Sequence, residues 1–208
     1  MGDVSSPTRP YRGISATERT ARRRAELMAA AFDLLGTVGW EQTTMTAICA
    51  RAKLTERYFY ESFASRDDLL IAVNEDLAER IRAVVVDALD AAPRDPEQTA
   101  RAAITVFVDF LTEDPRIGRV CIVEAGATAL LRQRKHQILG EFAELIVAKA
   151  REVFGKNSLP APRDRINALL FTGGLAEVLT SWLAGEVSAS KQDIIETAVN
   201  QFVRTAHR

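Results

Sequence analysis

Apolar residues recur every three or four positions along most of the chain, and glycines and prolines fall between these runs. This spacing is typical of amphipathic helices, whereas a half-buried strand alternates at every second position. No segment shows convincing strand alternation. The pattern therefore predicts an all-α protein.

Caps and breakers divide the pattern into about nine helices. Gly39 follows the first apolar run as a C-cap glycine would, and Thr44, Thr55 and Ser65 stand where N-caps are expected. Two prolines within residues 91–96 predict a linker. The predicted helices cover residues 17–38, 44–52, 56–63, 65–89, 97–112, 116–124, from beyond 126 to 154, 163–184 and 191–207.

Residues 44–63 have the layout of a helix-turn-helix. A capped helix of about two turns is followed by a break at Lys53, a second cap, and a short helix rich in polar and aromatic residues. Phe59 and Phe63 are spaced i and i+4 and are predicted to face a small core. In such a unit the second helix enters the major groove of DNA, and the first crosses the backbone.

The outer face of the second short helix carries the candidate chemistry. Arg57 is expected to bind guanine O6 and N7, Tyr58 a thymine methyl or a phosphate, and the Tyr60 hydroxyl a phosphate. From this short segment alone, an ordinary solvated helix is the alternative. The predicted DNA-binding residues are Thr44, Lys53, Thr55, Glu56, Arg57, Tyr58, Tyr60 and Arg66.

The charge distribution agrees with DNA binding at one end of the chain. The 208 residues have a net charge of −1, but residues 1–66 hold ten basic and seven acidic side chains, a net +3. The remainder holds seventeen basic and twenty-one acidic side chains, a net −4. A basic end on an acidic body suits a protein in which one region meets phosphates.

Residues 39–70 closely resemble the DNA-binding signature of TetR-type repressors. The shared features are a glycine–aromatic pair, a threonine pair, an isoleucine followed by a small residue, a turn, a capping hydroxyl, an aromatic pair, a phenylalanine and a basic–acidic start to a long helix. Two positions depart from the family pattern, which usually has glycine where this chain has Lys53 and often where it has Arg57. A positive φ at Lys53 would cost about 1 kcal/mol.

The resemblance implies a domain plan. Residues 1–16 are expected to form a flexible basic arm, which enters the minor groove or only keeps the protein in solution. Residues 17–65 form the DNA-binding domain, and residues 66–208 form a ligand-sensing and dimerising domain. The resemblance further implies a homodimer through the eighth and ninth helices, repression at a palindromic double-stranded operator, and an effector whose binding shifts the fourth helix.

The resemblance places the effector among the fifth to eighth helices, where we expect a mostly apolar small molecule. Glu124 falls on the apolar stripe of the sixth helix, so it is expected to orient a cationic or hydroxyl-bearing ligand or to pair with an arginine. Plain core packing is the alternative for the other candidates. The candidate ligand-binding residues are Phe107, Phe110, Cys121, Glu124, Phe171 and Trp182.

Other functional classes find little support in the sequence. No nucleophile elbow, phosphate loop or dinucleotide fingerprint is present, so neither an enzyme nor a cofactor is predicted. Cys49 and Cys121 are expected to fill the core, and the two histidines share no zinc-ligand spacing with them. We expect a cytoplasmic protein without a membrane span. The alternative is a helical small-molecule-binding protein without DNA recognition.

Overall fold

A computed structural model describes residues 15–207, and within that range it contains nine α-helices and no strand. The all-α prediction is confirmed, and most predicted boundaries hold within one or two residues. The helices are α1 Ala16–Thr37, α2 Met45–Ala52, α3 Glu56–Ser62, α4 Arg66–Ala91, α5 Pro96–Glu113, α6 Pro115–Gly118, α7 Ala129–Phe154, α8 Arg163–Leu183 and α9 Lys191–Thr205. The predicted N-terminal arm, residues 1–16, lies almost entirely outside the described residues.

Two of the three predicted N-caps close their helices as expected. The Thr44 hydroxyl accepts from the backbone N–H of Ala47, and the Ser65 hydroxyl accepts from that of Asp68. The third prediction is wrong in its chemistry. Thr55 occupies the N-cap position of α3 with an extended backbone, but its side chain makes no capping hydrogen bond.

The predicted sixth helix, residues 116–124, is a composite. Only Pro115–Gly118 is α-helical; a π-helical segment η1 (Arg119–Val123) and a 3₁₀ turn η2 (Glu124–Gly126) follow. The Glu124 N–H donates to the Arg119 carbonyl, an i to i+5 bond that brings these two residues onto the same side of the wider helix. A second 3₁₀ turn, η3 (Gly155–Asn157), follows α7.

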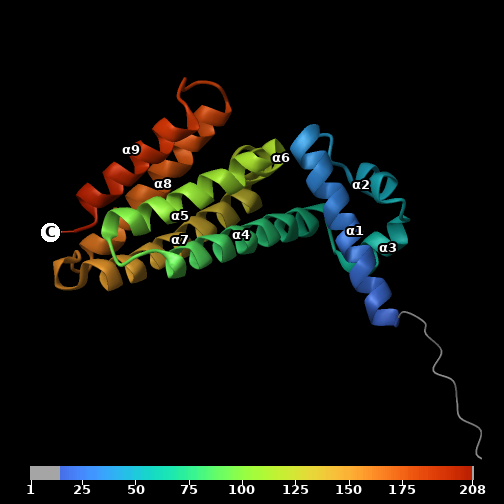
Figure 1. Cartoon of the computed structure of the whole chain (residues 1–208). Coiled ribbons are helices and arrows are strands. Elements are labelled where there is room, and N and C mark those ends of the chain that lie inside the picture. Colours follow the sequence, from blue (N-terminus) through green and yellow to red (C-terminus); the bar gives the residue numbers. More distant parts are fainter. Residues whose placement is uncertain (1–14, 208) are drawn as a thin grey trace, which may run out of the picture.

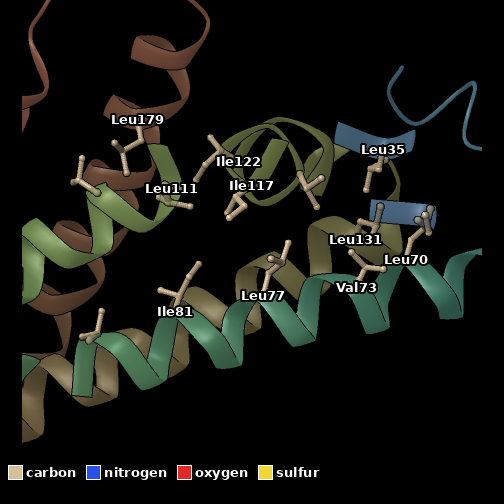
Figure 2. Close-up of a cluster of buried hydrophobic side chains, with 14 of the residues drawn as sticks. Leu35, Leu70, Val73, Leu77, Ile81, Leu111, Ile117, Ile122, Leu131 and Leu179 are labelled. Atoms are coloured by element: carbon tan, nitrogen blue, oxygen red, sulfur yellow. The ribbon is translucent and has the colours of Figure 1, made fainter. Parts of the chain in front are cut away.

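The helices are arranged along α4. In Figure 1, α1 to α3 lie at one end, α4 leads away from them beside α5 and α7, and α8 and α9 lie on the far side. Most buried apolar residues form one cluster from α1 through α4 to α8 and α9, and Figure 2 shows part of it between Leu35 and Leu179. A small second cluster lies between α7 and α8. The two expected domains therefore share a continuous core.

The last two helices differ in what they expose. The apolar stripe of α9 packs inside the subunit, where Ile195 and Val199 are buried and Phe202 meets the ring of Phe171. The stripe of α8 instead reaches the surface, with Leu170 70% and Ile166 54% exposed. By length and composition alone α8 could cross a membrane, and 17% of its most apolar window is buried inside the protein.

Candidate nucleic-acid interface and ligand cavity

The turn between α2 and α3 is built on Lys53. This residue adopts a left-handed conformation, with φ 55° and ψ 38°, and it is the one non-glycine residue with positive φ in the described chain. Its backbone N–H donates to the Ala50 carbonyl, and the Leu54 N–H donates to the Cys49 carbonyl. The lysine side chain is exposed and precedes the N-terminus of α3.

Two arginines of α1 hold α3 in place. The Arg23 guanidinium lies 4.1 Å from the ring centroid of Tyr58, and that of Arg24 lies 4.1 Å from the ring centroid of Phe63. Arg24 also donates to the Ser62 carbonyl, which ends the helix, at 2.9 Å. Sequence reasoning missed both roles. The available signal was the run of arginines at 22–24 in the first helix, together with aromatic residues in the third helix on which a guanidinium can stack.

The outer face of α3 is open to solvent. The Arg57 side chain is 84% exposed and forms an i, i+4 ion pair with Glu61 at 3.2 Å, and Tyr60 is 60% exposed. Thr44, Thr55 and Glu56 are also exposed. A helix that reads base edges needs this combination of a buried aromatic face and a free polar face.

Two of the predicted DNA-binding residues are less free than expected. Tyr58 is half-buried beneath Arg23, so only part of its ring faces outward. Arg66 is half-buried too, because its guanidinium stacks over Trp40 at 3.8 Å from the ring centroid.

A cavity lies inside the second half of the protein, between α4, α5, α7 and α8. Three of the six candidate ligand-binding residues line it, namely Phe107, Cys121 and Phe171. Burial raises the pKa of the Cys121 thiol to about 12, so this side chain is a neutral wall group.

The other three candidates lie elsewhere. Phe110 lies outside the cavity lining, with the Arg80 guanidinium 5.4 Å from its ring centroid. The indole N–H of Trp182 donates to the Ala189 carbonyl at 2.8 Å and ties the end of α8 to the loop before α9. Periodicity identified all three as inward-facing, but it does not tell a cavity wall from solid core.

The third of these, Glu124, belongs to a contact between the two halves. Its carboxylate accepts from the Arg119 Nε at 3.1 Å and from the Trp40 backbone N–H at 3.0 Å. Arg119 also donates to the Thr37 carbonyl at the end of α1. Glu124 thus takes the second of its two expected roles, pairing with an arginine, and its side chain is only 12% exposed.

Further contacts strengthen this connection, which we call the α1–α6 joint. Asp33 of α1 binds Arg116 at 2.8 Å and Arg51 of α2 at 2.6 Å. Gly36 packs so closely on α6 that a Cβ atom there would lie 2.5 Å from the Arg116 Cβ. The joint consists of Asp33, Gly36, Thr37, Trp40, Arg116, Arg119 and Glu124.

The joint and the cavity share one segment. Cys121, Ile122 and Ala125 line the cavity from η1 and η2, while Arg119 and Glu124 of the same segment hold α1. A molecule in the cavity would therefore touch residues directly adjacent to those that position the DNA-binding helices.

Fold and surface together define a helix-turn-helix regulator with a helical second domain. Residues 27–73 match the sequence profile of the bacterial regulatory proteins of the tetR family. The match covers the helix-turn-helix segment, where the resemblance was predicted. The chain is a DNA-binding transcription regulator.

Two curated relatives come from Mycolicibacterium smegmatis. The HTH-type transcriptional regulator EthR is 26% identical over 169 residues, which cover 80% of this chain and 76% of EthR. The HTH-type transcriptional activator FasR is 31% identical over 108 residues, which cover 51% of this chain and 49% of FasR.

Solved structures share the fold. The transcriptional regulator FadR of Bacillus subtilis, solved in complex with stearoyl-CoA, superposes with a TM-score of 0.73 over 88% of this chain and 99% of that chain. The two sequences are only 17% identical, so this likeness concerns the architecture alone.

Proposed function

We propose that this protein is a transcriptional repressor that binds a palindromic operator as a homodimer and is released by a small, mostly apolar effector. The observation that carries the proposal is the α1–α6 joint, because one short segment both lines the apolar cavity and binds the end of α1. Arg57, on the open face of α3, supplies the base-reading side chain of the proposed interface.

The homodimer is proposed to form through α8, with α9 contributing its polar outer face. The exposed stripe of α8 combines apolar side chains with Gly173 and Gly174, where an added Cβ would meet no atom within 4 Å. A second copy of this helix approaches closely at such a pair. The charged residues at its start and its packing on α7 favour an interface over a membrane span.

A substitution at the centre of this stripe tests the dimer. Leu170→Glu places a carboxylate on the most exposed apolar position of α8, and we expect a monomer by light scattering. Leu130→Glu is the matched control, because Leu130 is 42% exposed on α7, away from the stripe. A Leu170→Glu protein that remains dimeric contradicts the proposed interface.

Release by an effector requires a difference in affinity. The ligand must bind more tightly to the conformation that does not fit DNA, and this preference is the whole coupling free energy, typically about 1–3 kcal/mol. The two recognition helices of a dimer must lie about 34–36 Å apart to enter successive major grooves. A shift of η1 transmitted through Arg119 and Glu124 to α1 would alter that spacing.

Selection from genomic fragments followed by footprinting tests operator recognition directly. We expect a palindrome, a steep fall of affinity with salt, and a loss of about 1–3 kcal/mol of discrimination in Arg57→Ala at the base that it contacts. Arg94→Ala, an exposed arginine in the linker after α4, is the control that should leave binding unchanged. Failure to bind any duplex at low salt would leave the alternative, a ligand-binding protein without DNA recognition.

The direction of regulation needs its own measurement, because the relative FasR is named as an activator. A protein that covers an operator blocks transcription without contacting polymerase, whereas an activator needs a further contact. Repression therefore requires less of the proposed DNA-binding surface than activation does. In a reporter strain we expect expression to rise when the gene is deleted. A fall would make this protein an activator.

A further inference from the structure

We propose that the effector is a single-chain amphiphile with an anionic head group, and that Lys135 binds this head group. The inference rests on the proposed ligand site and names the chemical class that the site accepts. Three properties of the cavity carry it: its length, the chemistry of its walls and the sign of its charged residues.

The cavity is long. Its lining extends along α4 from Asn74 to Leu89 and along α5 from Pro96 to Leu111, fifteen residue steps on each helix. At 1.5 Å per residue each stretch measures about 22 Å. The two helices pack against one another and run in opposite directions, so both stretches border the same channel. An extended, unbranched alkyl chain fits such a shape better than a compact ring system.

The walls offer few free hydrogen-bond donors. Among the lining residues that the structure describes, the uncharged polar side chains are Asn74, Thr99 and Thr172, besides the thiol of Cys121. Asn74 donates to the Leu70 carbonyl, Thr99 to that of Pro93 and Thr172 to that of Leu169. The remaining walls are apolar, so a ligand gains chiefly by burying hydrocarbon.

The charged groups on the described lining are all cations: Arg134, Lys135 and Lys149. Arg134 already binds Glu75 at 3.1 Å and Glu141 at 3.0 Å, and Lys149 binds Glu152 at 2.9 Å. The Lys135 ammonium donates to one backbone carbonyl, that of Ile122, at 3.1 Å. No carboxylate of the described chain lies within ion-pair distance of it.

Lys135 is therefore an incompletely paired, half-buried cation at one end of an apolar channel. Burial lowers its pKa, and Glu177 of α8 opposes this from a longer distance. An anionic group of the ligand would supply the missing partner in a charge-assisted hydrogen bond. A ligand with a positive head group would be repelled by the charged residues of the lining, which are all cations.

Binding at Lys135 also reaches the DNA-binding half. The carbonyl that Lys135 holds belongs to Ile122 of η1, three residues from Arg119. A head group that draws the ammonium away from this carbonyl changes the segment that supports α1. The contact between Lys135 and the head group should therefore affect two separate measurements, the affinity for the ligand and the release of DNA.

The test uses the full-length protein and isothermal titration with palmitate, palmitoyl-CoA and hexadecanol. Palmitate and hexadecanol differ mainly in the charge of the head, and palmitoyl-CoA distinguishes a carboxylate from a phosphate-bearing head. We expect at least one of the two anions to bind tenfold or more tightly than hexadecanol. Lys135→Met should remove this preference and leave hexadecanol affinity within twofold.

Two further variants make the result specific. Lys149→Met removes a cavity cation that is already paired, and it should leave the preference for the anion intact. Lys135→Arg keeps the charge and should restore most of the affinity that Lys135→Met loses. Equal binding of palmitate, palmitoyl-CoA and hexadecanol by the wild type, or loss of the preference in Lys149→Met instead, overturns the proposal.

A gel shift with the selected operator separates this inference from the proposed function. Anion-selective binding without release of DNA supports the ligand class and contradicts the repressor mechanism. Operator binding by a protein that takes up none of the three amphiphiles contradicts the ligand class and leaves the repressor mechanism standing.

Discussion

The DNA-binding half and the sensing half of this molecule use their interiors differently. Helices α1 to α3 pack around a core in which Leu27, Ile48 and Phe59 are fully buried. Their candidate DNA-binding side chains lie on the outer surface, mainly on α3. Helices α4 to α8 leave a channel between them and are proposed to do their chemistry inside. Under the proposed function, one half must match the fixed shape of DNA, and the other must accept a small molecule.

This difference predicts that the two halves respond differently to mutation. A filled core loses van der Waals contacts in all directions when a side chain is shortened, whereas a side chain that borders a cavity already lacks partners on one side. The same substitution should therefore cost a different amount of unfolding free energy in the two halves.

The largest expected effect is the removal of Phe59. Phe59→Ala empties the centre of the DNA-binding core, and we expect it to cost about 3–5 kcal/mol of unfolding free energy. Phe107→Ala makes the same chemical change at a half-buried cavity wall and should cost less than half as much. Urea denaturation of both variants measures the difference. Equal costs would mean that the channel is closed in solution.

The contrast between the packed core of α1 to α3 and the cavity among α4 to α8 also determines what the sequence alone could predict. The helix boundaries of the DNA-binding half were predicted closely, because caps, turns and aromatic spacing are local signals. The left-handed backbone of Lys53 was foreseen only as a condition with a cost. The cavity depends on how four helices separated in sequence pack, so periodicity put Phe107 and Trp182 in the same class although only Phe107 lines it.

The joint shows a second limit of sequence reasoning. Glu124 was expected on an α-helical stripe, but the π-helical η1 changes the register and turns this carboxylate towards Arg119 and α1. No local signal announced the change, because Val120 and Ile122 are buried only through contacts with distant helices. The domain division at residue 65 stays a prediction, and the buried core continues through α4 across it.

A pair of glycines tests the joint next. In Gly36→Ala the new Cβ would overlap the Arg116 Cβ and approach its Cα at 3.1 Å, so α6 must move; we expect a loss of about 1–3 kcal/mol. Gly140→Ala, in the middle of α7, meets no atom within 4 Å and should instead stabilise the protein by about 0.5–1 kcal/mol. Thermal unfolding gives both signs. A stable Gly36→Ala protein would show that α1 and α6 are not in firm contact.

A smaller effect on stability, with a larger one on regulation, is expected for Glu124→Gln. The amide retains one acceptor oxygen but loses the ion pair with Arg119, and because Arg119 is 39% exposed the cost should be about 1–2 kcal/mol. Operator affinity without effector should change little, while release by effector should weaken. Titration of the operator complex with effector measures this, and Glu186→Gln, an exposed change in the turn after α8, is the control. Unaltered release would exclude Glu124 from the coupling.

The smallest change concerns the turn of the DNA-binding half, where stability and function oppose one another. Lys53→Gly relieves a left-handed strain of about 1–2 kcal/mol but adds about 0.5–1 kcal/mol of unfolded-state entropy, so the net gain should be about 0–1.5 kcal/mol. If Lys53 contacts a phosphate, the slope of log affinity against log salt should fall by about 1 for each lysine removed. Lys53→Asn separates the two effects, because asparagine tolerates this conformation without glycine's freedom. Both variants should lose the same salt dependence, and an unchanged slope in both would mean that the strained lysine serves the turn and not the DNA.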